Sequence, residues 1–154
     1  KVLYTVEGEV PEDSYTIPFG EADIAREGND ITVVALGRMV HQALEAADKL
    51  SGEGISCEVL DLRTTSPLDE ETILESVENT GRVVVVDEAN PRCSIATDIS
   101  ALVARKAFQH LEAPVEMVTA PHTPVPFSGA LEDIYIPSPD NIVSAVKTVM
   151  EFSR

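Results

Sequence analysis

The chain has 154 residues, of which 44% are hydrophobic and 25% are charged, a composition typical of one folded domain and unlike that of a disordered chain. Its 27 acidic and 11 basic residues give a formal net charge of −16, which repels nucleic acid and anionic membranes and attracts basic partners. No apolar run is long enough to span a membrane, and the start of the chain has no signal-peptide pattern, so we expect a cytoplasmic protein.

The acidity itself has two explanations. It is either a surface for a dedicated basic partner or an adaptation to solubility or to a saline cell, and the salt dependence of association would separate the two.

The first elements follow an irregular start. Residues 1–20 predict a lead segment, because glycines and prolines are scattered there among acidic residues. We therefore expect a single domain over 21–154. A turn signal at 28–30 separates a short strand at 21–27 from a second strand at 31–36.

The rest of the chain alternates between helical and strand patterns. In chain order we expect a helix at 38–51 with its apolar stripe on the sheet, a strand at 55–62, and a helix whose first turn is capped by Asp69, Glu70 and Glu71. A strand at 82–87 and a helix at 94–109, which buries Phe108, come next. A strand at 115–119 and a closing helix at 140–152, capped by Asp140, complete the pattern. This alternation predicts a three-layer α/β/α sandwich.

Two adjacent carboxylates follow an unbroken run of four valines. Val83–Val86 is typical of a parallel strand buried on both faces, and Asp87 and Glu88 come at its carboxyl end, where α/β sheets usually bind ligands. An apolar strand that ends in Asp-Glu is also found in P-loop NTPases. The chain has no phosphate-binding P-loop motif, which argues against that interpretation.

A second loop, 120–127, contains three prolines and is rigid enough to present side chains to a partner, although a plain connector is an equal alternative. His122 and Phe127 lie in this loop. His122 has no carboxylate or cysteine at motif spacing, so a hydrogen-bonded loop residue is favoured over a catalyst. Cys57 and Cys93 have no metal-ligand or disulfide spacing, and packing is favoured for both.

None of these features assembles a catalytic site. The chain lacks a nucleophile elbow, a metal-ligand cluster and a glycine-rich dinucleotide turn. Residue chemistry alone therefore predicts an α/β domain that works through a partner.

Four parts of the chain resemble one known family. They are Ile17–Ala22, Ile31–Gly37, Glu58–Thr64 with Ser66–Asp69, and Leu131–Asp133 with Ile136-Pro137. These segments and their order are similar to the carboxyl-terminal half of the β subunit of thiamine diphosphate-dependent 2-oxo acid dehydrogenases, the transketolase C-terminal domain. The loops Val86–Cys93 and Ala120–Phe127 resemble the acetoin dehydrogenase branch more than the pyruvate or branched-chain branches.

The resemblance implies a five-stranded mixed sheet whose first strand is antiparallel to the others. It also implies that thiamine diphosphate and magnesium are bound in the parent oxidoreductase by a preceding domain and by the α subunit. We therefore expect no catalytic, cofactor-binding or metal-binding residue here, and no cofactor or activity in this fragment alone.

The reaction implied by the resemblance is the cleavage of acetoin with transfer of its acetyl unit to a lipoyl group. A pyruvate or branched-chain 2-oxo acid dehydrogenase is the near alternative. A stand-alone interaction module without catalysis is the alternative of another class.

The partners implied are a second β subunit and the α subunits of an α₂β₂ tetramer, and the subunit-binding domain of a dihydrolipoyl acyltransferase in a multienzyme complex. Neither nucleic acid nor membrane is expected as a partner. We place the acyltransferase contact at 147–154, unless this helix face packs on its own domain. The residues expected there are Lys147, Met150, Glu151, Phe152 and Arg154, with Asp133 near the same surface.

Overall fold

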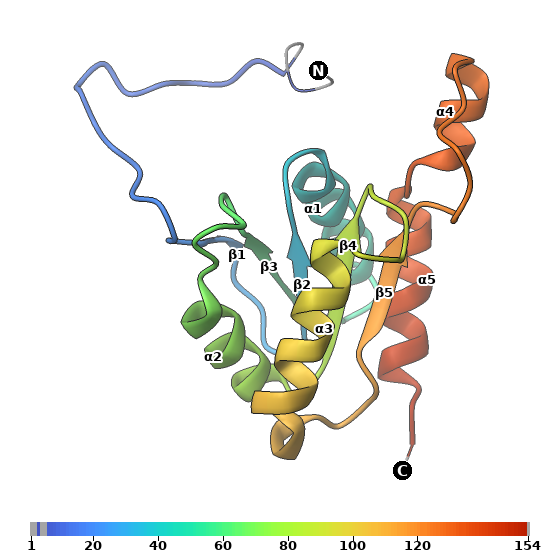
Figure 1. The fold of residues 1–154 in the computed structure, drawn as a ribbon. Coiled ribbons are helices and arrows are strands. Elements are labelled where there is room, and N and C mark those ends of the chain that lie inside the picture. The colour runs from blue at the N-terminus through green and yellow to red at the C-terminus, as the bar shows by residue number, and fades with distance from the viewer. Residues whose placement is uncertain (1–2, 4–5, 154) are drawn as a thin grey trace.

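The computed structural model describes residues 3 and 6–153, which form a three-layer α/β/α sandwich around a five-stranded sheet (Figure 1). The strand order is β1-β3-β2-β4-β5; β1 is antiparallel to β3 and the other pairs are parallel. The elements are β1 (Asp23–Arg26), β2 (Ile31–Ala35), α1 (Arg38–Ser51), β3 (Cys57–Asp61), α2 (Glu70–Thr80), β4 (Val83–Asp87), α3 (Ile95–Lys106), η2 (Phe108–His110), β5 (Glu116–Thr119), α4 (Gly129–Tyr135) and α5 (Pro139–Met150). The predicted fold class and the antiparallel first strand are both confirmed.

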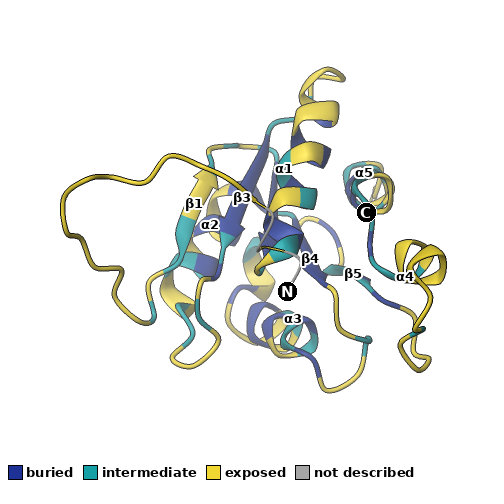
Figure 2. Ribbon diagram, turned by 90° about the horizontal axis from the view of Figure 1, so that it is seen from above, coloured by how far each residue is buried: buried dark blue, intermediate teal, exposed yellow. Residues whose placement is uncertain are grey.

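Two of the three inner strands, β2 and β4, form the centre of the core. Every residue of both strands is buried, as the run of four valines predicted (Figure 2). Successive side chains point to opposite faces, so Val84 packs in the cluster with α1 and α5, whereas Val85 packs in the cluster with α2 and α3. Each face of the sheet therefore has its own apolar core beneath a helical layer.

A polar seam crosses the second of these faces. The Thr32 hydroxyl of β2 lies 2.6 Å from the Ser76 hydroxyl and 2.7 Å from the Thr80 hydroxyl, both on α2. Ser76 also donates a hydrogen bond to the buried carboxylate of Glu58 on β3. These bonds give the buried polar groups partners and fix the position of α2 along the sheet.

The first turn of α2 confirms the predicted cap. The Asp69 carboxylate accepts hydrogen bonds from the Thr72 amide at 3.1 Å and from the Thr72 hydroxyl at 2.8 Å. It also accepts one from the Ala22 amide at 2.8 Å. Asp69 therefore joins the start of α2 to the segment that leads into β1.

The helix expected at 94–109 ends earlier than predicted. α3 stops at Lys106, because Ala107 leaves the helical region with φ −118° and ψ 14°, and a short 3₁₀ turn follows. The prediction that Phe108 is buried was wrong: its side chain is 71% exposed.

Asp140 does not cap the closing helix. The cap is Ser138, whose hydroxyl accepts from the Asn141 amide while its own amide donates to the Asn141 side chain, and Pro139 follows as the first helical residue. Proline is well suited to that position, so the helix begins one residue before the predicted start at 140. Asp140 instead accepts a hydrogen bond from Lys49 of α1 at 2.9 Å.

α4 was not predicted. It has seven residues, none of them buried, and it extends beyond the carboxyl edge of the sheet (Figure 1). The described residues 6–19 are likewise almost all exposed and run away from the sandwich. Within the described part of the chain, no helix is both long and apolar enough to cross a membrane.

Candidate functional site

The loops after β4 and β5 lie side by side at the carboxyl edge of the sheet. β4 ends at Asp87 and β5 at Thr119, and the two strands are parallel neighbours. The Ala120 amide donates a hydrogen bond to the Ala89 carbonyl at 3.0 Å, which joins the loops directly. The two segments that the sequence singled out separately are therefore one region of the surface.

Asp87 has a structural role in this region. Its side chain is only 8% exposed, and one carboxylate oxygen accepts a hydrogen bond from the Ala89 amide at 3.0 Å. This bond closes the turn that follows β4. Glu88 is exposed, so the two adjacent carboxylates differ in environment.

A hollow of about 610 Å³ opens beside these carboxylates. The side chains around it are Asp87, Glu88, Ala89, Val125, Glu132, Tyr135 and Ile136. Sequence reasoning identified Asp87 and Glu88 but missed Glu132 and Tyr135 as their neighbours, because only the unpredicted helix α4 places those two residues there. The hollow combines carboxylates with an aromatic and aliphatic wall, which suits a cationic or apolar side chain of a partner.

The other two loop candidates are not part of this hollow. His122 is exposed, and no hydrogen bond or ion pair joins it to the other described residues, so its role as a hydrogen-bonded loop residue stays a prediction. Phe127 is wholly exposed, at 103% of its reference area. Neither residue is positioned for proton transfer or nucleophilic chemistry within this chain.

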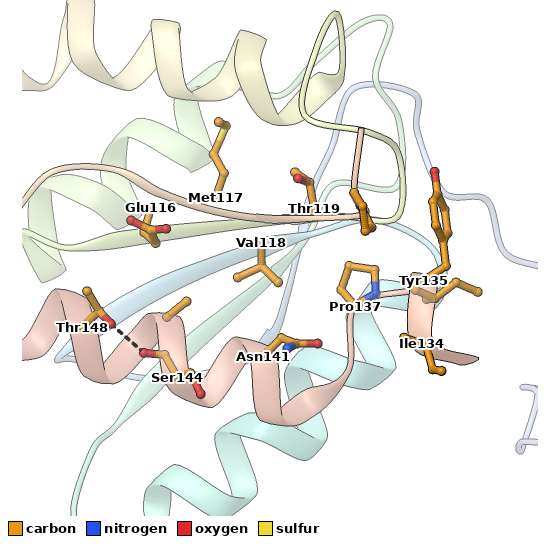
Figure 3. Close-up of a pocket in the computed structure, with 13 residues that line it drawn as sticks. Glu116, Met117, Val118, Thr119, Ile134, Tyr135, Pro137, Asn141, Ser144 and Thr148 are labelled. Carbon is orange, nitrogen blue, oxygen red and sulfur yellow. Dashed lines mark hydrogen bonds between the residues drawn. The ribbon is translucent and has the colours of Figure 1, made fainter. Parts of the chain in front are cut away.

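A second hollow, of about 460 Å³, lies between β5 and α5 (Figure 3). Glu116, Thr119 and Asn141 border it, and Ile134 and Tyr135 of α4 close one end. Its titratable groups are the carboxylate of Glu116 and the phenol of Tyr135, which closes the far end of the groove. This groove therefore has no pair of groups suited to acid-base catalysis.

The chain end forms a third candidate region, at the opposite end of α5. Phe152 is 45% exposed and lines an apolar hollow of about 480 Å³ together with Phe108. Met150 is partly buried against the core, while Glu151 is exposed. Lys147 pairs with Glu53 at 2.6 Å. Arg154 lies outside the described residues.

Asp133 is not near this surface, contrary to the expectation. It lies on α4, before the first residue of α5, whereas Glu151 follows the last one. A helix of that length separates them by roughly 18 Å along its axis (Figure 1). Asp133 instead neighbours Glu132 at the carboxyl edge.

The cysteines divide into one buried and one exposed thiol. Burial raises the pKa of Cys57 to about 11, so this thiol stays protonated and unreactive at neutral pH. Cys93 is exposed, and the prediction that it packs in the core was wrong. It takes a left-handed φ of 53° in the turn before α3.

The described residues do not fit a cofactor or metal site. They contain no group of three or more histidine, cysteine, aspartate or glutamate side chains arranged to hold a metal ion. The pyrophosphate of a cofactor would need a set of free amides or cations, and the two hollows at the carboxyl edge are bordered by carboxylates instead. We therefore derive no catalytic step from this chain.

Both a protein family and a solved structure match this chain. Residues 20–142 match the family described as "Transketolase, C-terminal domain". Among solved structures, the fold matches one titled "Split gene transketolase, inactive beta4 tetramer", with a TM-score of 0.80 and 30% identity over 96% of this chain and 47% of the other.

Two curated relatives extend the match to named enzymes. The chain is 64% identical to the "Acetoin:2,6-dichlorophenolindophenol oxidoreductase subunit beta" of Cupriavidus necator, over 98% of this chain and 45% of the relative. It is 47% identical to the "Pyruvate dehydrogenase E1 component subunit beta" of Bacillus subtilis, over 99% of this chain and 46% of the relative. The chain thus spans about half the length of the curated relatives that it matches.

Proposed function

Because this chain belongs to the transketolase C-terminal domain family, we propose that it is the carboxyl-terminal assembly domain of the β subunit of a thiamine diphosphate-dependent acetoin dehydrogenase. The observation that carries the proposal is the difference in identity, 64% to an acetoin oxidoreductase subunit against 47% to a pyruvate dehydrogenase subunit over nearly the same residues. The absence of catalytic geometry in the described residues supports an assembly role.

In the proposed complex, thiamine diphosphate and magnesium would be held by a preceding domain and by the α subunit. They would supply the chemistry that cleaves acetoin into acetaldehyde and an acetyl unit for a lipoyl group. This domain contributes by holding subunits together in a cytoplasmic α₂β₂ tetramer and by offering a surface to a dihydrolipoyl acyltransferase.

We place the acyltransferase contact at the chain end. The exposed ring of Phe152 and the apolar hollow that it shares with Phe108 provide an anchoring site for an apolar side chain. Glu151 is exposed beside them and carries the charge that attracts a basic docking domain. Lys147 is already paired with Glu53, so it contributes less to this attraction.

The test is substrate preference in the complete enzyme. The complete β subunit is co-produced with its α subunit, and reduction of 2,6-dichlorophenolindophenol is followed with acetoin, pyruvate and a branched-chain 2-oxo acid, with and without thiamine diphosphate. We expect cofactor-dependent reduction with the highest kcat/KM for acetoin.

Two outcomes would replace the proposal. A higher kcat/KM for pyruvate or for the branched-chain acid would assign the chain to that dehydrogenase. No cofactor-dependent reduction with any of the three would leave a stand-alone interaction module as the better account. The reading frame before Lys1 offers a separate check, because the proposal requires a further domain there.

A further inference from the structure

The helix α4 exposes large apolar side chains instead of burying them. Ile134 is 80% exposed and Leu131 is 55% exposed, and no residue of the helix is buried. An isolated helix of seven residues is unstable in water, since most helical stability in proteins comes from packing of an apolar face. A covering partner would supply the packing that this helix lacks.

The proline-rich loop adds to the same surface. Val125 is 69% exposed and Phe127 is wholly exposed. The Tyr135 hydroxyl donates to the Thr123 carbonyl at 3.3 Å, which ties the loop to α4. Prolines of the loop border a small hollow of about 210 Å³ together with Leu131 and Ile134. We define Val125, Phe127, Leu131 and Ile134 as the α4 patch.

Four carboxylates near the α4 patch are unpaired in the described part of the chain. The acidic rim consists of Asp87, Glu88, Glu132 and Asp133, and none of these carboxylates forms an ion pair within the described structure. The sequence contains no lysine or arginine between Lys106 and Lys147, so this part of the chain supplies no cation of its own. Some carboxylates elsewhere do form ion pairs, as in the contacts of Glu53 with Lys147 and of Glu112 with Arg82.

We propose that the α4 patch and its acidic rim form the docking surface for a partner subunit that presents apolar side chains surrounded by lysine or arginine. Under the proposed function, on which this inference rests, that partner is the α subunit. Apolar anchors at the centre and complementary charge at the rim are the usual anatomy of a stable interface.

Two other occupants fit less well. A second copy of this chain would place two acidic rims together, and like charges oppose such pairing in a chain of net charge −16. The acyltransferase is assigned to the chain end, on the far side of α5 from this patch.

The experiment measures pairing of the complete β subunit with the α subunit by sedimentation and by titration. The first variant, Phe127→Ser with Ile134→Ser, removes apolar area; the second, Glu132→Lys with Asp133→Lys, reverses the rim charge. The matched control is Phe19→Ser, which removes another ring that is 84% exposed and lies before β1. All these side chains are exposed, so the fold is expected to survive, and circular dichroism verifies it.

We expect each double variant to weaken pairing with the α subunit at least tenfold, and Phe19→Ser to leave it unchanged. The effect of the charge variant should diminish at high salt. If wild-type α and β pair but both double variants pair equally well, the docking surface is wrong and the proposed function stands. If the variants abolish only self-association of β, a second copy is the occupant and the inference is overturned. If wild-type β does not pair with α at all, both the proposed function and the docking surface fail.

Discussion

At the scale of single residues, Asp69 shows how one side chain acts on two elements. Burial by itself raises the pKa of this carboxyl, but the hydrogen bonds from the Ala22 amide, the Thr72 amide and the Thr72 hydroxyl outweigh burial and lower the pKa below its ordinary value. A lowered pKa in the folded state means that the ionised carboxylate stabilises the fold. This stabilisation is present above the ordinary pKa of 3.8 and is lost as the pH falls through the folded value.

We predict different effects for two substitutions at Asp69. Asp69→Ala removes the cap and should lower the free energy of unfolding by about 1–2 kcal/mol at neutral pH. Asp69→Asn keeps a capping oxygen and should lower the free energy of unfolding by less. The difference in this free energy between Asp69→Asn and the wild type should shrink as the pH falls below 3.8. Urea unfolding at a series of pH values measures both. Glu71→Gln, in the same helical turn, is the control; a wild-type advantage over Asp69→Asn that persists at low pH would contradict the account.

Gly28 gives a second prediction at this scale. A Cβ at this position would lie 2.1 Å from the backbone of Cys57 and Glu58, and backbone atoms in a sheet cannot move aside. Gly28→Ala should therefore destabilise the protein by about 3 kcal/mol or more. Gly8→Ala, with nothing within 4 Å of its Cβ, is the matched control and should be neutral in thermal unfolding. Equal stability of the two variants would show that the turn before β2 adjusts.

At the scale of elements, the seam between β2, β3 and α2 is the least replaceable contact. Apolar packing alone would allow α2 to shift along the sheet, whereas the hydroxyls of Thr32, Ser76 and Thr80 fix one register. α4 is the contrasting case, since no residue of it is buried in the described fold. α2 is therefore held by its own domain, whereas α4 is available to a partner.

Replacing Thr32 tests this seam. Thr32→Val keeps the side-chain volume but leaves the buried hydroxyls of Ser76 and Thr80 with one partner fewer, so we expect a loss of about 1–3 kcal/mol in the free energy of unfolding. Thr148→Val on the exposed side of α5 removes only a bond to the Ser144 carbonyl and should change the value by less than about 0.5 kcal/mol. Denaturant unfolding compares the two, and an equal loss in both would argue against the seam.

At the scale of the whole molecule, the net charge of −16 acts through separate surfaces. The chain end carries Glu151 beside an apolar hollow, and the carboxyl edge carries Asp133 beside the α4 patch. α5 lies between these two regions. A mutation that reverses one charge should therefore affect one partner more than the other.

The matched pair Glu151→Lys and Asp133→Lys separates the two surfaces. Glu151→Lys should slow association with the acyltransferase's subunit-binding domain by roughly threefold at low salt, because a rim charge acts mainly on the association rate. Asp133→Lys should have little effect on that rate. Stopped-flow kinetics at two salt concentrations measure it, and an equal rate for Glu151→Lys and the wild type would remove the chain end as the docking site.

Much of the fold could be predicted from local pattern. The valine run of β4 and the acids that start α2 each specify one conformation through contacts with near neighbours or through simple burial. The errors occurred at helix ends. Ser138 caps α5 in place of Asp140, and Phe108 falls after the end of α3.

The candidate site was only partly predictable. Asp87 and Glu88 were found from their place after a buried strand, but Glu132 and Tyr135 come from a short helix that buries no residue in the core. The expected proximity of Asp133 and Glu151 failed for a different reason. The closing helix, which the sequence did predict, lies between the two residues and places them at its opposite ends.

The sequence by itself determined the order of the strands and of the helices that cover the sheet, the layered α/β/α class and the strongly acidic surface, because periodicity and composition act through burial and net charge. Only the tertiary structure decided which side chains meet. It brings the loops after β4 and β5 together through the bond between Ala120 and Ala89, and it leaves the α4 patch exposed among unpaired carboxylates. The reason is that contacts between residues distant along the chain depend on strand pairing and helix placement, which no local pattern encodes.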